Sequence, residues 1–91
     1  MKTLHLNLKA EYFNDIESGN KAEEYRLCTP YWTKRLVGRK YDTIVLKRGY
    51  PRKDDRASHL IRPWKGYTAK TITHPHFGDK PVEVFAIDVG V

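Results

Sequence analysis

The hydrophobic positions of this chain fall into short runs with the two-residue period of β-strands. Leu4, Leu6 and Leu8 point to one side of a strand, and polar residues separate them. Later runs of β-branched and aromatic residues are bounded by Gly or Pro, which is typical of further strands. The pattern predicts five strands in all, over residues 4–8, from near Lys21, and over residues 42–47, 66–73 and 81–91.

Two other segments have the spacing of helices. Residues 10–18 place their large apolar side chains on one face, and Gly19 is typical of a residue that ends a helix in the left-handed conformation. A second helix is expected to begin after Thr29, because Thr caps helices and Pro30 suits the first helical position. Gly38 is expected to end it.

Residues 49–63 have no apolar period, because the charge cluster Arg52–Arg56 fills their centre. We expect a mobile loop there, in which Leu60 and Ile61 could add a strand or an anchor. Taken together, the elements predict one α+β domain over residues 1–91, a small β-barrel of about five strands with two short helices.

Composition limits the class of protein. The apolar fraction of 40% suits a compact core, while 31% charged residues and an alternating N-terminal pattern argue against a spanning helix or a signal peptide. The single cysteine, Cys28, is expected to be a small buried residue, and it cannot form an internal disulfide. A cytoplasmic protein without a membrane partner is therefore predicted, and a monomer is favoured.

Positive charge is concentrated in the middle of the chain. The net charge is +6, and residues 34–70 hold twelve Lys or Arg against three acids. A segment with this excess of positive charge is suited to binding a polyanion such as a nucleic acid, since each neutralised phosphate releases counterions. Aromatic and basic residues also interleave here, which provides faces for stacking bases beside charges for phosphates. The rim residues expected to serve in this way are Arg48, Tyr50, Arg52, Trp64 and Lys65.

A charged motif lies between the first helix and the strand after it. It comprises Gly19, Lys21, Glu24 and Arg26. Side chains alternate along a strand, so Glu24 and Arg26 share one face, and Lys21 joins them only if a bulge intervenes. A lysine there could bind a phosphate or act as a base, and an arginine offers a planar fork to a phosphate or a base edge.

The motif G-x-K-x-x-E-x-R, placed after the first helix of a chain of this size, resembles the signature of the ASCH domain. The order of the predicted elements is similar too, and the small single-domain members carried by bacteria and their phages look closest. The resemblance implies a PUA-like β-barrel. ASCH relatives include a hydrolase that deacetylates N4-acetylcytidine, and ribonucleases. That amidohydrolase pattern has Thr three residues after the Lys, where this chain has Glu24, so the same hydrolysis does not carry over.

We therefore expect a domain that binds RNA, single-stranded nucleic acid or a nucleotide in a basic cleft around Lys21, Glu24 and Arg26, with no cofactor and no metal. Two alternatives stay open. One is a hydrolase acting on RNA or a modified nucleoside, with Lys21 and Glu24 as an acid/base pair and a role for His74 or His76. The other is a phage-borne protein-interaction module whose basic surface meets an acidic partner.

Overall fold

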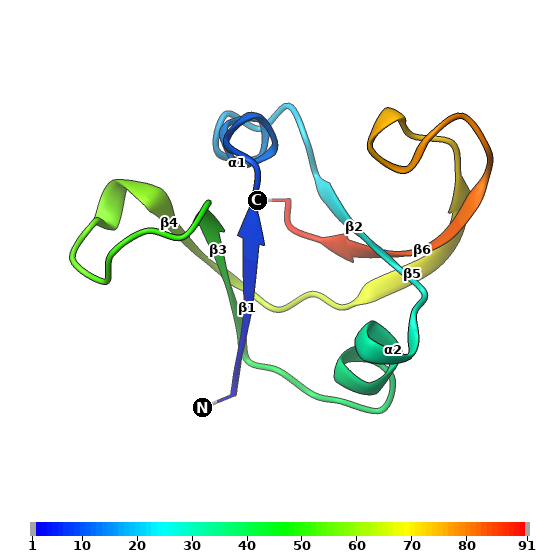
Figure 1. Ribbon diagram of the computed structural model, residues 1–91. Coiled ribbons are helices and arrows are strands. Elements are labelled where there is room, and N and C mark those ends of the chain that lie inside the picture. Colours follow the sequence, from blue (N-terminus) through cyan, green and yellow to red (C-terminus); the bar gives the residue numbers. More distant parts are fainter. Residues whose placement is uncertain (1, 91) are drawn as a thin grey trace.

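A computed structural model describes residues 2–90 and places six strands and two α-helices among them (Figure 1). In chain order these are β1 (Thr3–Leu8), α1 (Ala10–Glu17), β2 (Glu23–Leu27), α2 (Pro30–Leu36), β3 (Thr43–Arg48), β4 (His59–Pro63), β5 (Tyr67–Ile72) and β6 (Val82–Asp88). Two short 3-10 helices, η1 (Arg56–Ser58) and η2 (Pro75–Phe77), precede β4 and follow β5. The protein is a small α+β domain.

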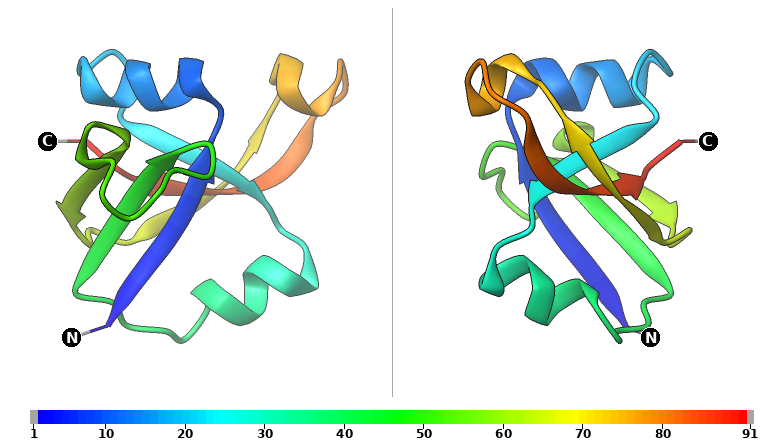
Figure 2. Two further views of the ribbon diagram at one scale, coloured as in Figure 1. Left: turned by 60° about the vertical axis from the view of Figure 1, so that its left-hand side comes forward. Right: turned by 90° about the vertical axis from the view of Figure 1, so that its right-hand side faces the viewer.

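The strands form two three-stranded sheets. In the first, with the order β1-β3-β4, β1 runs parallel to β3 and β4 is antiparallel. The second has the order β2-β6-β5 and is wholly antiparallel. The two sheets pack over a shared core, with α1 and α2 at opposite ends (Figure 2). Within residues 2–90 no strand pairing joins the two open sheets, so a closed barrel is not shown, and the six strands compare with the about five expected from the sequence.

The core draws on both sheets and both helices. Leu6 from β1, Ile44 from β3 and Ile87 from β6 are almost fully buried, and Phe13 of α1 and Leu36 of α2 cover the two ends. Burying side chains of this size is the main stabilising contribution in so short a chain. No helix within residues 2–90 is long and apolar enough to cross a membrane.

The helix ends follow the chemistry read from the sequence. The Thr29 side chain accepts a hydrogen bond from the backbone N–H of Trp32 at 3.3 Å, and Pro30 occupies the first helical position. Gly19 and Gly38 follow α1 and α2 with φ of +87° and +71°, a conformation that favours glycine. Both predicted helices are confirmed.

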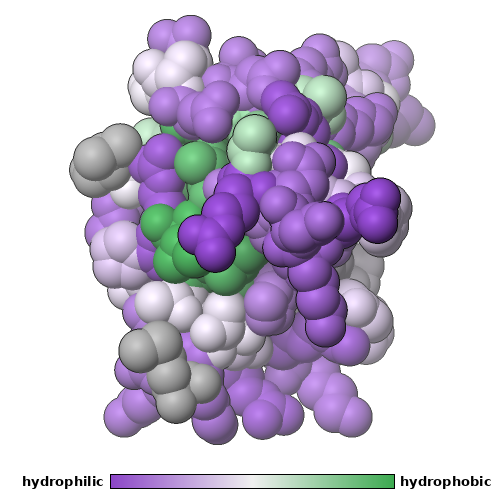
Figure 3. All heavy atoms as spheres, turned by 90° about the vertical axis from the view of Figure 1, so that its left-hand side faces the viewer, coloured by the Kyte–Doolittle hydropathy of each residue, from purple (hydrophilic) through white to green (hydrophobic). Residues whose placement is uncertain are grey.

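The predicted loop over residues 49–63 is partly wrong, because its second half contains η1 and β4. Leu60 pairs with Leu46 of β3, and it packs against the core. On the opposite face of β4, Ile61 is 73% exposed. Figure 3 looks onto this side of the molecule and shows an apolar area enclosed by hydrophilic side chains. The expected burial of Cys28 is also wrong, since it lies just beyond β2 and is exposed.

Candidate functional site

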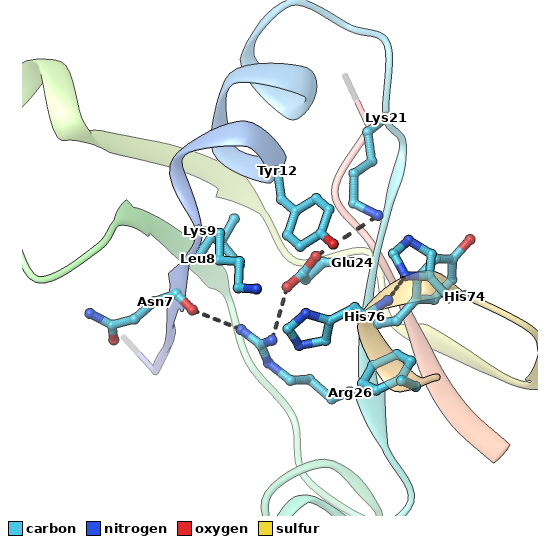
Figure 4. Close-up of a pocket in the computed structure, with 11 residues that line it drawn as sticks. Asn7, Leu8, Lys9, Tyr12, Lys21, Glu24, Arg26, His74 and His76 are labelled. Carbon is cyan, nitrogen blue, oxygen red and sulfur yellow. Dashed lines mark hydrogen bonds and ion pairs between the residues drawn. The ribbon is translucent and has the colours of Figure 1, made fainter. Parts of the chain in front are cut away.

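A pocket of about 140 Å³ opens at the end of the molecule that carries α1 (Figure 4). Its walls come from the end of β1, the first turn of α1, the start of β2 and the segment around η2, which lies beside α1 in Figures 1 and 2. The charged motif contributes three of the lining side chains. The full lining is Asn7, Leu8, Lys9, Tyr12, Lys21, Glu24, Tyr25, Arg26, His74, His76 and Phe77.

Glu24 is the buried acid of this pocket, with 4% of its surface exposed. It pairs with Ile87 of β6 in the sheet register, so its side chain points toward the core side of the second sheet. Its two oxygens meet different cations: Oε2 lies 2.9 Å from Nη1 of Arg26, and Oε1 lies 3.9 Å from Nζ of Lys21. One carboxylate thus lies between two cations in a poorly solvated position.

Lys21 reaches the pocket from the turn before β2. Its backbone N–H donates to the carbonyl of Asp15 at 3.1 Å, which ties the turn to α1. Because the strand begins only at Glu23, the alternation of side chains does not apply to Lys21, and no bulge is needed to bring it to Glu24. The Nζ atom lies 4.5 Å from the ring centroid of Tyr25, which restricts the ammonium group through a cation–π contact.

Arg26 forms the wall of the pocket that faces α2. Besides its ion pair with Glu24, its Nη2 donates to the backbone carbonyl of Asn7 at 3.1 Å. The guanidinium carbon lies 5.2 Å from the ring centroid of Trp32 on α2. Its Nε is buried and has no hydrogen-bond partner within residues 2–90. The guanidinium group is therefore held in place while one of its donors is unused.

Rings from the η2 segment complete the pocket. The ring of His76 lies 5.8 Å from that of Tyr12 and 4.9 Å from that of Phe77, both nearly perpendicular to it. His74 lies 5.9 Å from Tyr25, and its Nδ1 accepts a hydrogen bond from the backbone N–H of His76 at 3.1 Å. Edge-to-face contacts of this kind hold the rings in fixed orientations. Across residues 2–90 no group of three or more His, Cys, Asp or Glu side chains is arranged to hold a metal ion.

Burial in the pocket opposes charge on Glu24 and on His76. Burial raises the pKa of the Glu24 carboxyl, and the nearby Arg26 and Lys21 only partly offset this. Burial lowers the pKa of His76, and the positive charges of Lys9 and Arg26 together with the neighbouring His74 lower it further. The acid and the imidazole are thus shifted in opposite directions within one cavity, a pattern often found in functional sites.

The structure brings Lys21, Glu24 and Arg26 together, but none of the five predicted rim residues lines this pocket. Arg48 lies over the ring of Phe13 and donates to Asn14 and Ser58. Trp64 packs edge-to-face on Tyr41, against the core.

The other rim residues are held elsewhere or exposed. Lys65 donates to the carbonyl of Gly90 and pairs with Asp88. Tyr50 is 92% exposed, and Arg52 pairs with Asp54 at the surface. Their loop lies on the far side of α1 from η2 (Figure 1). The rim expected from the sequence is therefore not at the pocket.

Sequence reasoning missed part of the lining and gave another part no firm role. Tyr12 has the spacing of an apolar helix position, and nothing in the local pattern marks its neighbours Asn7 and Lys9 as site residues. His74 and His76 stood out in the sequence, but about fifty residues separate them from the motif. Only the pairing of β5 and β6 with β2 brings η2 to this end of the molecule.

Comparison with known proteins gave no match: no protein-family model, no curated protein and no solved structure is significantly similar to this chain. The interpretation of the pocket therefore depends on its own geometry and chemistry.

Proposed function

We propose that this protein binds RNA or another single-stranded nucleic acid by taking one nucleotide into the pocket, as a PUA-like domain of the ASCH type. The observation that carries the proposal is the buried Glu24 carboxylate between Lys21 and Arg26, in a cavity walled by aromatic and imidazole rings. Rings offer stacking faces to a base, a carboxylate accepts hydrogen bonds from exocyclic amines, and cations attract phosphate. These three requirements of nucleotide recognition are met within one cavity.

The size of the cavity indicates that only part of a ligand enters it. At about 140 Å³ it is smaller than the pockets that enclose drug-sized molecules, which are roughly 300–1,000 Å³. A single planar ring suits such a space, with the rest of the ligand outside. This supports a nucleotide within a strand, entering by its base.

The unused donor of Arg26 supports a ligand as well. Leaving a buried N–H without an acceptor costs about 1–3 kcal/mol, so buried donors without a partner are uncommon. A small adjustment of the guanidinium group on binding would give Nε an acceptor from the ligand. The cost in the free protein would then be recovered in the complex.

Binding to labelled single-stranded RNA tests the proposal directly. We expect fluorescence anisotropy to report an affinity that falls steeply with salt, and Lys21→Met to weaken binding by about 10- to 100-fold, the range for a lost charged hydrogen bond. Lys53→Met, in the exposed loop, is the matched control and should bind nearly as well as the wild type. Equal affinities of the two variants, or no binding at low salt, would contradict the proposal. Binding only to acidic proteins would instead favour an interaction module.

A hydrolase acting on RNA or a modified nucleoside is the second candidate, because the pKa values of Glu24 and His76 are shifted in opposite directions. A protonated Glu24 could donate a proton while a neutral His76 accepts one. Since the pKa of His76 lies below its usual 6.5, turnover should persist at mildly acidic pH and fail only lower, where the imidazole is protonated. RNA and N4-acetylcytidine are the substrates to assay. His76→Gln should abolish turnover in a variant that still folds, and an inert wild type would exclude this candidate.

A further inference from the structure

The pocket does not end at Arg26, because a row of cations and aromatic rings continues from it onto α2. Arg26 stacks over Trp32 at 5.2 Å, and the ring of Trp32 lies 5.1 Å from that of Tyr31. The guanidinium carbon of Arg35 then lies 3.5 Å from the centroid of Tyr31. The four side chains follow one another in the order cation, ring, ring, cation. They form a continuous path from the pocket wall to solvent, which we call the α2 ladder.

The outer part of the α2 ladder is open to a ligand. Tyr31 is 54% exposed, so more than half of its surface is accessible from solvent. The guanidinium group of Arg35 lies over one face of the Tyr31 ring and restricts its orientation. Arg35 is itself held by a hydrogen bond of 3.4 Å from Nη1 to the backbone carbonyl of Tyr31. Trp32 is partly buried against the core, so it provides a rigid base for the exposed ring. An exposed aromatic ring in a fixed orientation is suited to stacking a base.

Charge around the α2 ladder points to a polyanion. From Leu27 to Tyr41 the chain has no acid. Its four cations are all exposed, and none of them forms an ion pair within residues 2–90: Lys34, Arg35, Arg39 and Lys40. The loop of residues 49–58 differs, since its three cations are accompanied by Asp54 and Asp55. A run of positive charge without neighbouring acids therefore lies beside the α2 ladder.

We infer that a single-stranded nucleic acid leaves the pocket across α2, with a neighbouring base stacked on Tyr31 and its phosphates near Arg35 and Lys40. This rests on the proposed function and extends it, because it names the surface along which the rest of the strand runs and the residues that contact it there. The α2 ladder supplies the contacts outside the pocket that so small a cavity requires. It also defines the path of the nucleic acid over the surface, from η2 toward α2.

The test compares ligands of two lengths. Wild type, Tyr31→Ala and Arg35→Ala are titrated with nucleoside monophosphates and with a mixed-sequence single-stranded RNA of about 12 nucleotides, within the usual site sizes. Tyr31→Ala should weaken binding of the long RNA by about 5- to 100-fold, the range for one lost stacking contact, and leave binding of monophosphates unchanged. Arg35→Ala should do the same and also reduce the dependence on salt.

Two controls make the result specific. Tyr31→Phe keeps the ring and should bind like the wild type, and Tyr50→Ala removes the other exposed tyrosine and should have no effect. Wild-type affinity of both Tyr31→Ala and Arg35→Ala for the long RNA would overturn the inference while leaving the proposed function intact. So would equal competition by poly-glutamate, because an acidic polypeptide has no bases to stack. If the wild type binds neither RNA nor monophosphates, the proposed function itself fails.

Discussion

The pocket and the loop of residues 49–55 contain the same kinds of side chain in different surroundings. Each holds an arginine paired with an acid. Arg26 lies 2.9 Å from Glu24, with side-chain exposures of 18% and 5%, whereas Arg52 lies 3.9 Å from Asp54, with exposures of 89% and 82%. Water screens the exposed pair, so its interaction is weak. The two regions have the same kinds of residues. Their ion pairs differ in solvent exposure, and this difference separates the candidate site from an ordinary charged surface.

Replacing the two arginines should give the largest difference in stability between the two regions. Arg26→Ala leaves the buried Glu24 without its nearest cation, and we expect a loss of about 3 kcal/mol in the free energy of unfolding, the low end for breaking a buried ion pair. Arg52→Ala should leave the unfolding midpoint unchanged. Urea denaturation of both variants measures the difference. Losses of equal size would show that burial does not distinguish the two pairs.

Trp64 is a predicted rim residue that lies outside the pocket, just after β4. Because it packs on Tyr41 and against the core, Trp64→Ala should cost about 2 kcal/mol of stability, less than the 3–5 kcal/mol of a fully buried ring. RNA binding, measured by anisotropy at low temperature where the variant is folded, should be unchanged. A specific loss of binding in the folded variant would restore Trp64 to a stacking role.

Two glycines provide a matched pair with smaller effects. Gly19 and Gly49 have φ of +87° and +68°, and an added Cβ at either position would meet no atom of residues 2–90 within 4 Å. Alanine should therefore cost about 1 kcal/mol at each, from backbone strain alone. Only Gly19→Ala should also weaken RNA binding, because the turn that carries Lys21 follows it. Thermal unfolding and anisotropy on both variants check this, and equal binding would argue against a strict placement of Lys21.

The subtlest expected effect is a pH-dependent difference between the wild type and Glu24→Gln. Since the pKa of Glu24 is raised above its usual 4.5, the folded state binds a proton more tightly than the unfolded state does. The stability of the wild type relative to Glu24→Gln should thus fall as the pH rises from 4.5 through the raised value, and then stay constant. Unfolding free energies in urea across this range measure it. If the stability of the wild type relative to Glu24→Gln rises with pH instead, the attraction of Lys21 and Arg26 for the Glu24 carboxylate outweighs its desolvation.

Local patterns predicted most elements of the fold. Both helices begin and end near the expected residues because Pro30, Gly19 and Gly38 act through the backbone of their own neighbourhood. The local pattern leaves β4 open, since its inward-packing Leu60 follows the charge cluster Arg52–Arg56 and gains its partner, Leu46, through sheet pairing. The division into two sheets likewise depends on pairing between distant segments, which short-range periodicity does not contain.

Residue order alone sets the two helices, the strand character of most of the chain and the clustering of Lys21, Glu24 and Arg26 within one turn and strand. Contacts between distant segments bring these three residues together in a pocket, line it with His74, His76 and Tyr12, and place the basic surface of α2 beside it. Backbone conformation follows from neighbouring residues, whereas burial depends on segments brought together from across the chain. The shifted pKa values of Glu24 and His76 depend on that burial.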